Sequence, residues 1–333
     1  MLGIIVLTLT GALAGGFLLE KACEARDRRR YPPPGRCYDI GGRKLHLLSK
    51  GSGGPTVIIE QGAGGPSPLW WPVQEEAARF AEVCTYDRAG AGWSDPARAP
   101  RNVDERVADL HALLQASKAK PPYILVGHSY GGLLVRRFAR KYPQDVAGLV
   151  LVDTFEEGAY FRDDVLKTYA GITNIIRLFG ALHRIGLRRL WKTLSPDRPA
   201  NLPEAAHAAT VATTLRPSFY RAMVDDFESL QGMTPEERRP WVSGQLGTLP
   251  IAVVTHGVPF PGPFAVLEKY WKEGQQRLAG LSTNSKLIVA QRSNHMIQLD
   301  EVGLVVDAIR EVHTAARTSR PLVSTTAANA APA

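Results

Sequence analysis

The chain has 333 residues, 44% of them hydrophobic and 22% charged, a composition that excludes a fibrous or largely disordered protein. Its three cysteines include no CxxC pair, which excludes a disulfide-stapled scaffold, and no histidine pair has metal-ligand spacing, so neither a metal nor a cofactor is expected. The net charge of +8 is concentrated in residues 20–50 and 174–200, but no nucleic-acid-binding motif appears, so nucleic acid is not an expected partner.

The first 19 residues contain no charged side chain. As a helix they would be about 28 Å long, close to the hydrocarbon thickness of a bilayer. We therefore expect a single-pass membrane anchor at 1–19, followed by a charged linker at 20–31. A signal peptide cut after Ala14, which would give a secreted protein, is the alternative, although no basic residue precedes the apolar run. The side of the membrane stays open.

Between residues 32 and 317 short β-rich segments alternate with helical patterns, which is typical of an α/β domain with a mostly parallel sheet. Helices are expected near 70–80, 103–116, 130–141, 264–279 and 302–315. Strands are expected at 37–40, 44–48, 56–61, 82–86, 123–127, 147–152, 251–255 and 286–290.

The alternation stops between about residues 155 and 248, where helical periodicity and prolines predict a helical cap over one end of the sheet. Within it, residues 175–191 alternate apolar residues with arginine at helical spacing. Such a helix either packs its apolar face on the body of the protein or lies on an anionic bilayer. The Ala/Ser/Thr/Pro-rich segment 318–333 is expected to be a disordered tail.

The segment Gly127-His-Ser129-Tyr-Gly131 follows a buried strand and begins a helix. G-x-S-x-G in this context is a nucleophile elbow, in which small residues let strand and helix approach while the serine hydroxyl stays exposed. Ser129 is therefore the candidate nucleophile.

With its neighbours, this motif resembles the α/β-hydrolase superfamily, in particular its serine-nucleophile branch with a helical cap. The resemblance rests on five segments in order: 60–65, 86–95, 127–131, 148–153 and 293–295. It implies an eight-stranded, mostly parallel sheet flanked by helices, with the cap inserted after the sixth strand. Serine in place of aspartate at the elbow argues against epoxide hydrolase and haloalkane dehalogenase chemistry.

The resemblance also implies the other members of the site. The backbone N–H groups of Ala63 and Tyr130 would form the oxyanion hole. The base would be His295, which follows the last strand. His256, at the end of another strand, competes with it, and His128 is expected to point away from the site because it adjoins Ser129.

The acid that orients the base has two candidates. Members of this superfamily commonly place it after the seventh strand, but no carboxylate follows that strand directly, and the first is Glu268 in an expected helix. Asp153, directly after the sixth strand, matches a less common arrangement. It is the acid that we expect, with Glu268 as the alternative.

These residues predict a serine hydrolase that cleaves carboxylic esters, apolar or lipid-like ones given the anchor and the basic helix at 175–191. Trp70, Trp71, Tyr130 and Phe155 are expected to line its pocket. Two alternatives remain: an aminopeptidase-like amide hydrolase and a non-catalytic binding protein. In the amide hydrolase, acidic cap residues would bind a substrate ammonium, and the candidates are Glu156, Glu157, Asp163 and Asp164.

Overall fold

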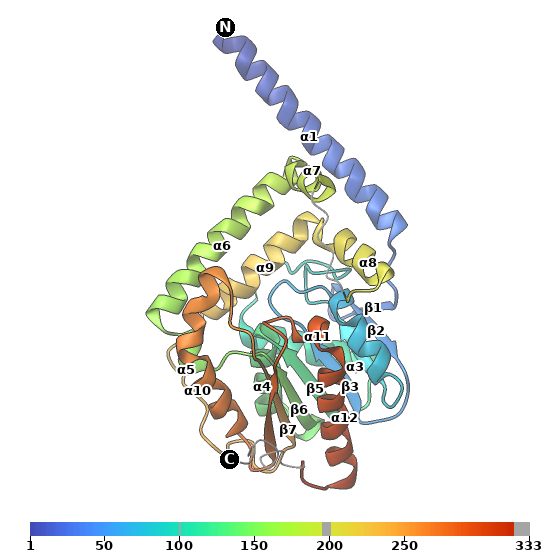
Figure 1. Ribbon diagram of the computed structural model, residues 1–333. Coiled ribbons are helices and arrows are strands. Elements are labelled where there is room, and N and C mark those ends of the chain that lie inside the picture. Colours follow the sequence, from blue (N-terminus) through green and yellow to red (C-terminus); the bar gives the residue numbers. More distant parts are fainter. Residues whose placement is uncertain (100, 195–200, 323–333) are drawn as a thin grey trace.

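Eight strands form one sheet in the order β1-β2-β4-β3-β5-β6-β7-β8 in the computed structural model, which describes residues 1–99, 101–194 and 201–322 (Figure 1). β1 and β2 pair antiparallel, as do β2 and β4, and the remaining pairs are parallel. The strands are β1 Arg36–Asp39, β2 Lys44–Lys50, β3 Thr56–Glu60, β4 Val83–Tyr86, β5 Tyr123–His128, β6 Val146–Val152, β7 Ile251–His256 and β8 Ser285–Ala290. The predicted eight-stranded, mostly parallel sheet is confirmed.

Helices cover both faces of this sheet. On one face α3 (Val103–Ser117), α4 (Tyr130–Lys141) and α10 (Glu268–Ala279) contribute to the larger hydrophobic core. On the other face α2 (Trp71–Ala77) and α12 (Val302–Thr318) contribute to the second core. Short helical turns connect these elements: η1 Ser67–Trp70, η2 Pro143–Asp145, η3 Gly262–Leu267 and α11 Ile297–Asp300. The central strands are apolar along their length because helices bury both of their faces.

Between β6 and β7 the described residues form five helices, which arch over one end of the sheet (Figure 1). Longest among them are α6 (Asp163–Arg184) and α9 (Pro217–Gln231), which pack together through Ile176, Tyr220 and Val224. The others are α5 Glu157–Tyr160, α7 Leu187–Leu194 and α8 Glu204–Thr214. The segment predicted as one helix over 175–191 is broken. Gly186 adopts φ +79°, a left-handed conformation that suits glycine, so α6 ends before it and α7 begins after it.

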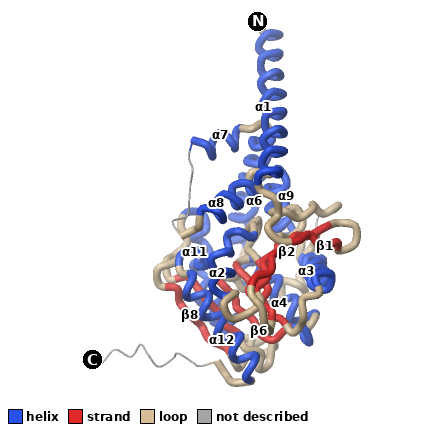
Figure 2. Tube along the Cα trace, turned by 90° about the vertical axis from the view of Figure 1, so that its right-hand side faces the viewer, coloured by secondary structure: helices blue, strands red, loops and turns tan. Residues whose placement is uncertain are grey.

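Helix α1, Leu2–Arg30, projects beyond the cap (Figures 1 and 2). It is the one helix in the described residues that is long and apolar enough to cross a membrane, a test that a signal sequence also passes. The expected charged linker at 20–31 is largely helical, since α1 runs on to Arg30. Arg189 of α7 stabilises this extension by binding Glu20 at 2.8 Å and Asp27 at 2.6 Å. Most of the expected tail, from residue 323 on, lies outside the described residues.

Candidate active site

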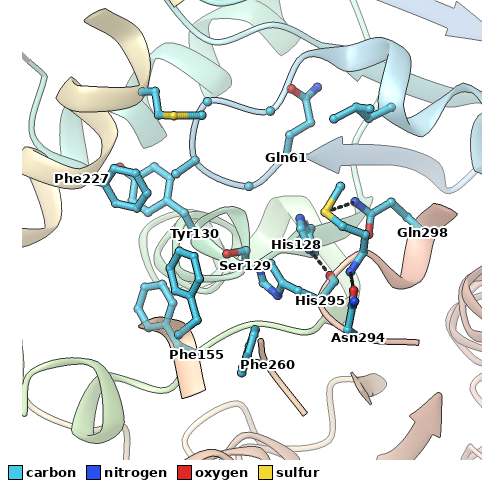
Figure 3. Close-up of a pocket in the computed structure, with 18 of the residues that line it drawn as sticks. Gln61, His128, Ser129, Tyr130, Phe155, Phe227, Phe260, Asn294, His295 and Gln298 are labelled. Atoms are coloured by element: carbon cyan, nitrogen blue, oxygen red, sulfur yellow. Dashed lines mark hydrogen bonds between the residues drawn. The ribbon is translucent and has the colours of Figure 1, made fainter. Parts of the chain in front are cut away.

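Ser129 stands on a sharp turn between β5 and α4. Its backbone has φ +51° and ψ −119°, a conformation that residues with a side chain rarely adopt. Ser129 is the N-cap of α4, yet its hydroxyl makes no capping hydrogen bond. It lines a cavity instead (Figure 3). The turn thus presents the hydroxyl at a helix N-terminus, where the helix dipole favours negative charge.

The glycines of the motif make this turn sterically possible. A Cβ atom on Gly131 would lie 2.4 Å from the carbonyl oxygen of Glu60, and one on Gly127 would lie 2.6 Å from the Cα atom of Gly132. Neither separation is tolerated by real side chains. Strand and helix therefore meet as closely as the sequence pattern predicts.

His295 is held by Asp153, the first residue after β6. Nδ1 of His295 lies 2.7 Å from Oδ2 of Asp153, and this carboxylate is fully buried. Burial by itself would raise the pKa of Asp153, but the hydrogen bonds from His256 and His295 outweigh it and hold the pKa below its ordinary value. When His295 donates from Nδ1, its Nε2 carries the lone pair that a general base needs.

A second histidine contacts the same carboxylate. Nδ1 of His256 lies 2.8 Å from Oδ1 of Asp153, and the backbone N–H of His256 donates to that oxygen at 2.9 Å. The other ring nitrogen, Nε2, lies 3.0 Å from Oε1 of Glu268. The structure thus pairs His295 with Asp153, whereas Glu268 reaches Asp153 through His256.

His128 lines the cavity, contrary to the expectation that it points away (Figure 3). Its Nε2 donates to the backbone carbonyl of His295 at 2.8 Å, and the two rings are 4.6 Å apart. Burial, with a smaller contribution from His295, lowers the pKa of His128 to about 3, so the ring is neutral. The alternation of strand side chains does not extend through the strained turn at Ser129, which is why the prediction was wrong.

Ala63 and Tyr130 are the predicted oxyanion donors. Both line the same cavity as Ser129. Tyr130 is the first residue of α4, where a backbone N–H has no partner within the helix. Ala63 lies in a turn that is closed by the hydrogen bond from Gly65 N–H to the carbonyl of Gly62, at 3.1 Å. The positions suit the predicted role of the two amides.

A buried ion cluster fixes the Ala63 turn to the cap. Arg88, after β4, donates to the carbonyls of Gln61 at 2.7 Å and Gly62 at 2.6 Å. The same guanidinium binds Asp226 of the cap helix α9 at 2.7 Å, and Asp226 also accepts the N–H of Gly64 at 2.9 Å. Sequence reasoning missed Asp226, since nothing in its neighbourhood distinguishes it from a surface carboxylate.

The cavity has a volume of about 430 Å³, within the range of small-molecule sites. Most of its wall is aromatic or aliphatic and comes from the cap, the loop before α10 and the elbow. Among the described residues that line it, none is Asp, Glu, Lys or Arg. Its polar side chains are Gln61, His128, Ser129, Thr210, Thr214, Asn294, His295 and Gln298, with the tyrosines 130, 160 and 169.

Of the aromatic residues predicted to line the pocket, Trp70, Tyr130 and Phe155 do so. Trp71 does not. Its ring stacks on that of Trp93, with the ring centroids 6.5 Å apart.

Comparison with known proteins agrees with this architecture. A family model described as the alpha/beta hydrolase fold matches residues 55–188. The uncharacterized protein YqjL of Bacillus subtilis is 30% identical over 282 residues, which cover 84% of this chain and 92% of that protein.

Solved structures of low sequence identity share the fold. The enol-lactonase from Burkholderia xenovorans has a TM-score of 0.60 at 15% identity, covering 84% of this chain and 100% of its own. An epoxide hydrolase from Bacillus megaterium has a TM-score of 0.63 at 16% identity, covering 83% of this chain and 99% of its own.

Proposed function

Because the chain belongs to the α/β-hydrolase superfamily and is a hydrolase, we propose that it cleaves carboxylic esters through an acyl-serine intermediate. One observation carries the proposal: the Ser129 hydroxyl and the His295 ring share an aromatic cavity whose lining, among the described residues, holds no charged side chain. Such a cavity suits a neutral, apolar acyl or alkyl group, since a charged one would lose its hydration without gaining a counter-ion.

In the proposed reaction, Oγ of Ser129 attacks the ester carbonyl carbon while Nε2 of His295 takes the serine proton. The resulting oxyanion accepts hydrogen bonds from the N–H groups of Ala63 and Tyr130. His295 then gives its proton to the departing alcohol, which leaves an acyl group on Ser129. A water that His295 deprotonates releases the acid and restores the serine. Asp153 keeps His295 in the required tautomer throughout.

The aminopeptidase alternative loses support from the ion pairs of the cap. A substrate ammonium would need a carboxylate in the cavity, but Glu156 binds Arg277, Glu157 binds Arg136, and Asp164 binds Lys269. None of these carboxylates, nor that of Asp163, belongs to a residue that lines the cavity.

An epoxide hydrolase is not favoured, although structural neighbours carry that name. The elbow residue is Ser129, and that chemistry calls for an aspartate at this position. A neighbour named as an enol-lactonase and another named as an N-acyl homoserine lactone degrading enzyme are closer to the proposal, because a lactone is a cyclic ester.

We further propose that α1 anchors the protein in a membrane, with secretion after cleavage as the alternative. The cap then meets the lipid surface through a cap-tip patch of exposed apolar residues: Leu178, Phe179, Leu187, Leu190 and Trp191. The ion pairs of Arg189 with Glu20 and Asp27 hold α7 beside the first charged turns of α1, at the level where its apolar part ends (Figure 1). Basic residues of the same segment, such as Arg184, suit anionic headgroups.

Hydrolysis by the full chain in detergent tests the proposed chemistry. The substrates are p-nitrophenyl esters from acetate to palmitate, a lactone, and an aminoacyl p-nitroanilide. We expect turnover of the esters with a preference for longer acyl chains, and its loss in Ser129→Ala. Turnover of the anilide alone would move the assignment to amides. If a fluorophosphonate failed to label Ser129 in the folded protein, the serine hydrolase assignment would fall and a binding role would replace it.

A further inference from the structure

Asp153 receives more hydrogen bonds than the orientation of one histidine requires. His295 approaches one carboxylate oxygen at 2.7 Å, while the ring and the backbone N–H of His256 approach the other at 2.8 Å and 2.9 Å. Nδ1 of His256 also lies 3.0 Å from the oxygen that His295 contacts. The two imidazoles therefore hold the carboxylate between them.

His256 is enclosed and does not line the cavity among the described residues. Its side chain is 4% exposed. The rings of Phe260 and Trp271 pack on it at 4.5 Å and 5.2 Å. Two charged groups face it, Asp153 from the end of β6 and Glu268 from the start of α10, and His295 lies beyond Asp153. Any effect of the His256 side chain on the cavity would therefore pass through Asp153 or Glu268.

Glu268 ties this arrangement to the cavity wall. The oxygen that receives Nε2 of His256 also accepts the backbone N–H of Phe260 at 2.7 Å. Phe260 lines the cavity, and its ring lies 5.3 Å from that of His295. The order of contacts is thus His295, Asp153, His256, Glu268, and then the loop that carries Phe260.

Resting on the function proposed above, we propose that His256 is a positioning residue: it fixes the Asp153 carboxylate from the side opposite His295, and Glu268 holds His256 in that orientation. Without the His256 ring, the carboxylate would keep its bonds to His295 and to the backbone N–H of residue 256, but it would lose the second imidazole and rotate more freely about its χ angles. A carboxylate that is held by His256 on a second side can present Oδ2 to His295 in a single orientation.

Burial alone would lower the pKa of His256, but the hydrogen bond and charge of Asp153, together with Glu268, raise the pKa above its ordinary value. The ring therefore favours its doubly protonated form, in which both nitrogens donate. This form matches the carboxylate found at each of its two nitrogens.

The kinetic test compares His256→Phe with His256→Asn, using the best ester substrate. Phenylalanine keeps the ring packing and the backbone N–H that donates to Asp153 but removes both ring N–H groups, whereas asparagine can still donate to Asp153 from near the position of Nδ1. We expect His256→Phe to lower kcat about 10- to 100-fold with little change in KM, because a small misplacement of a catalytic group has that effect. His256→Asn should recover most of the loss. Equal kcat in His256→Phe and the wild type would overturn the proposal.

Glu268→Gln tests the second half of the proposal. We expect a smaller loss of kcat, and no further loss when Glu268→Gln is added to His256→Phe, since the two residues act through one path. Independent, additive losses would contradict that path. His111→Phe is the matched control, because His111 faces Asp145 at 3.3 Å far from the cavity.

A spectroscopic measurement decides the point even if no ester is turned over. In the full chain labelled with ¹⁵N-histidine, the proton that His295 donates to Asp153 should give a low-field resonance in the wild type. We expect His256→Phe to shift or broaden that resonance and His111→Phe to leave it alone. An unchanged resonance in His256→Phe would refute the positioning role, whereas absent ester turnover with a shifted resonance would refute only the proposed substrate class.

Discussion

The backbone N–H of Gly64 donates to the carboxylate of Asp226, 162 residues further along the chain, at 2.9 Å. This bond joins the turn that carries Ala63 to helix α9 of the cap. The cap therefore contributes to the proposed oxyanion hole as well as covering the cavity.

Asp226→Asn should impair catalysis and folding together. The buried guanidinium groups of Arg88 and Arg106 both contact Asp226, so removing its charge leaves them less well neutralised. We expect a loss of about 3 kcal/mol in unfolding free energy, the scale on which breaking a buried pair destabilises. We also expect kcat to fall at least tenfold as the turn loosens. Urea unfolding and ester kinetics check this, with Asp225→Asn as the neighbouring control, and equal effects of the two variants would contradict it.

Ser129→Gly should be more stable than Ser129→Ala. Glycine adopts the φ of +51° found at this turn without strain, whereas alanine keeps a Cβ atom there. We expect the two inactive variants to differ by about 1 kcal/mol in unfolding free energy. Thermal unfolding of both, followed by circular dichroism, measures the difference. A more stable Ser129→Ala would mean that the turn relaxes when the hydroxyl is lost.

Gly131→Ala should damage the elbow, while Gly171→Ala should be harmless. The new Cβ at 131 would lie 2.4 Å from a backbone oxygen, but at 171, in α6, nothing lies within 4 Å. We expect Gly131→Ala to lower kcat strongly and to destabilise by a few kcal/mol, through overpacking. Gly171→Ala should gain about 0.5–1 kcal/mol from helix propensity. Comparable melting temperatures for the two variants would argue against the close approach at the elbow.

The contribution of His256 to stability should depend on pH. Its folded pKa is raised above the ordinary value of 6.5, so folding favours the protonated ring. That contribution is fully present below pH 6.5 and disappears as the pH rises through the folded pKa. The wild type should therefore exceed His256→Asn in stability most at pH 5.5 to 6.5 and least at alkaline pH. A stability difference that grew with pH would contradict a raised pKa of His256 in the folded state. His111→Asn serves as the control.

The cap-tip patch should meet lipid. Trp191 is 65% exposed in the structure, so its fluorescence should be quenched when the full chain is reconstituted in vesicles of brominated phosphatidylglycerol. The quenching should fall in Trp191→Phe and persist in Trp241→Phe, whose indole packs on Arg140 of the body. Unaltered quenching in Trp191→Phe would exclude contact between the patch and the membrane.

Local patterns allowed much of the fold to be predicted. Strands β3 to β7 form from short apolar runs, and the turn at Ser129 forms around neighbouring glycines. Each of these patterns can be seen within a few residues of the element that it forms. The candidate residues Ser129, Asp153 and His295 come together because the carboxyl ends of parallel strands meet at one edge of a sheet.

Features that depend on distant partners could not be predicted in this way. The attachment of residues 20–30 to the cap depends on Arg189, 169 positions from Glu20. The attachment of Glu268 to His256 depends on how the loop before α10 folds back. Asp226 becomes important only because Arg88 and Gly64 arrive beside it.

The uncharged lining of the cavity bears on product release. The proposed reaction turns a neutral ester into a carboxylate, and the described lining residues include no lysine or arginine that could neutralise it. An anion in that setting is poorly solvated and is driven toward water. The uncharged lining therefore favours binding of the neutral substrate and disfavours binding of the acid anion that is formed from it. We therefore expect fatty acid anions to inhibit turnover only weakly as they accumulate. Product release would then need no additional conformational step.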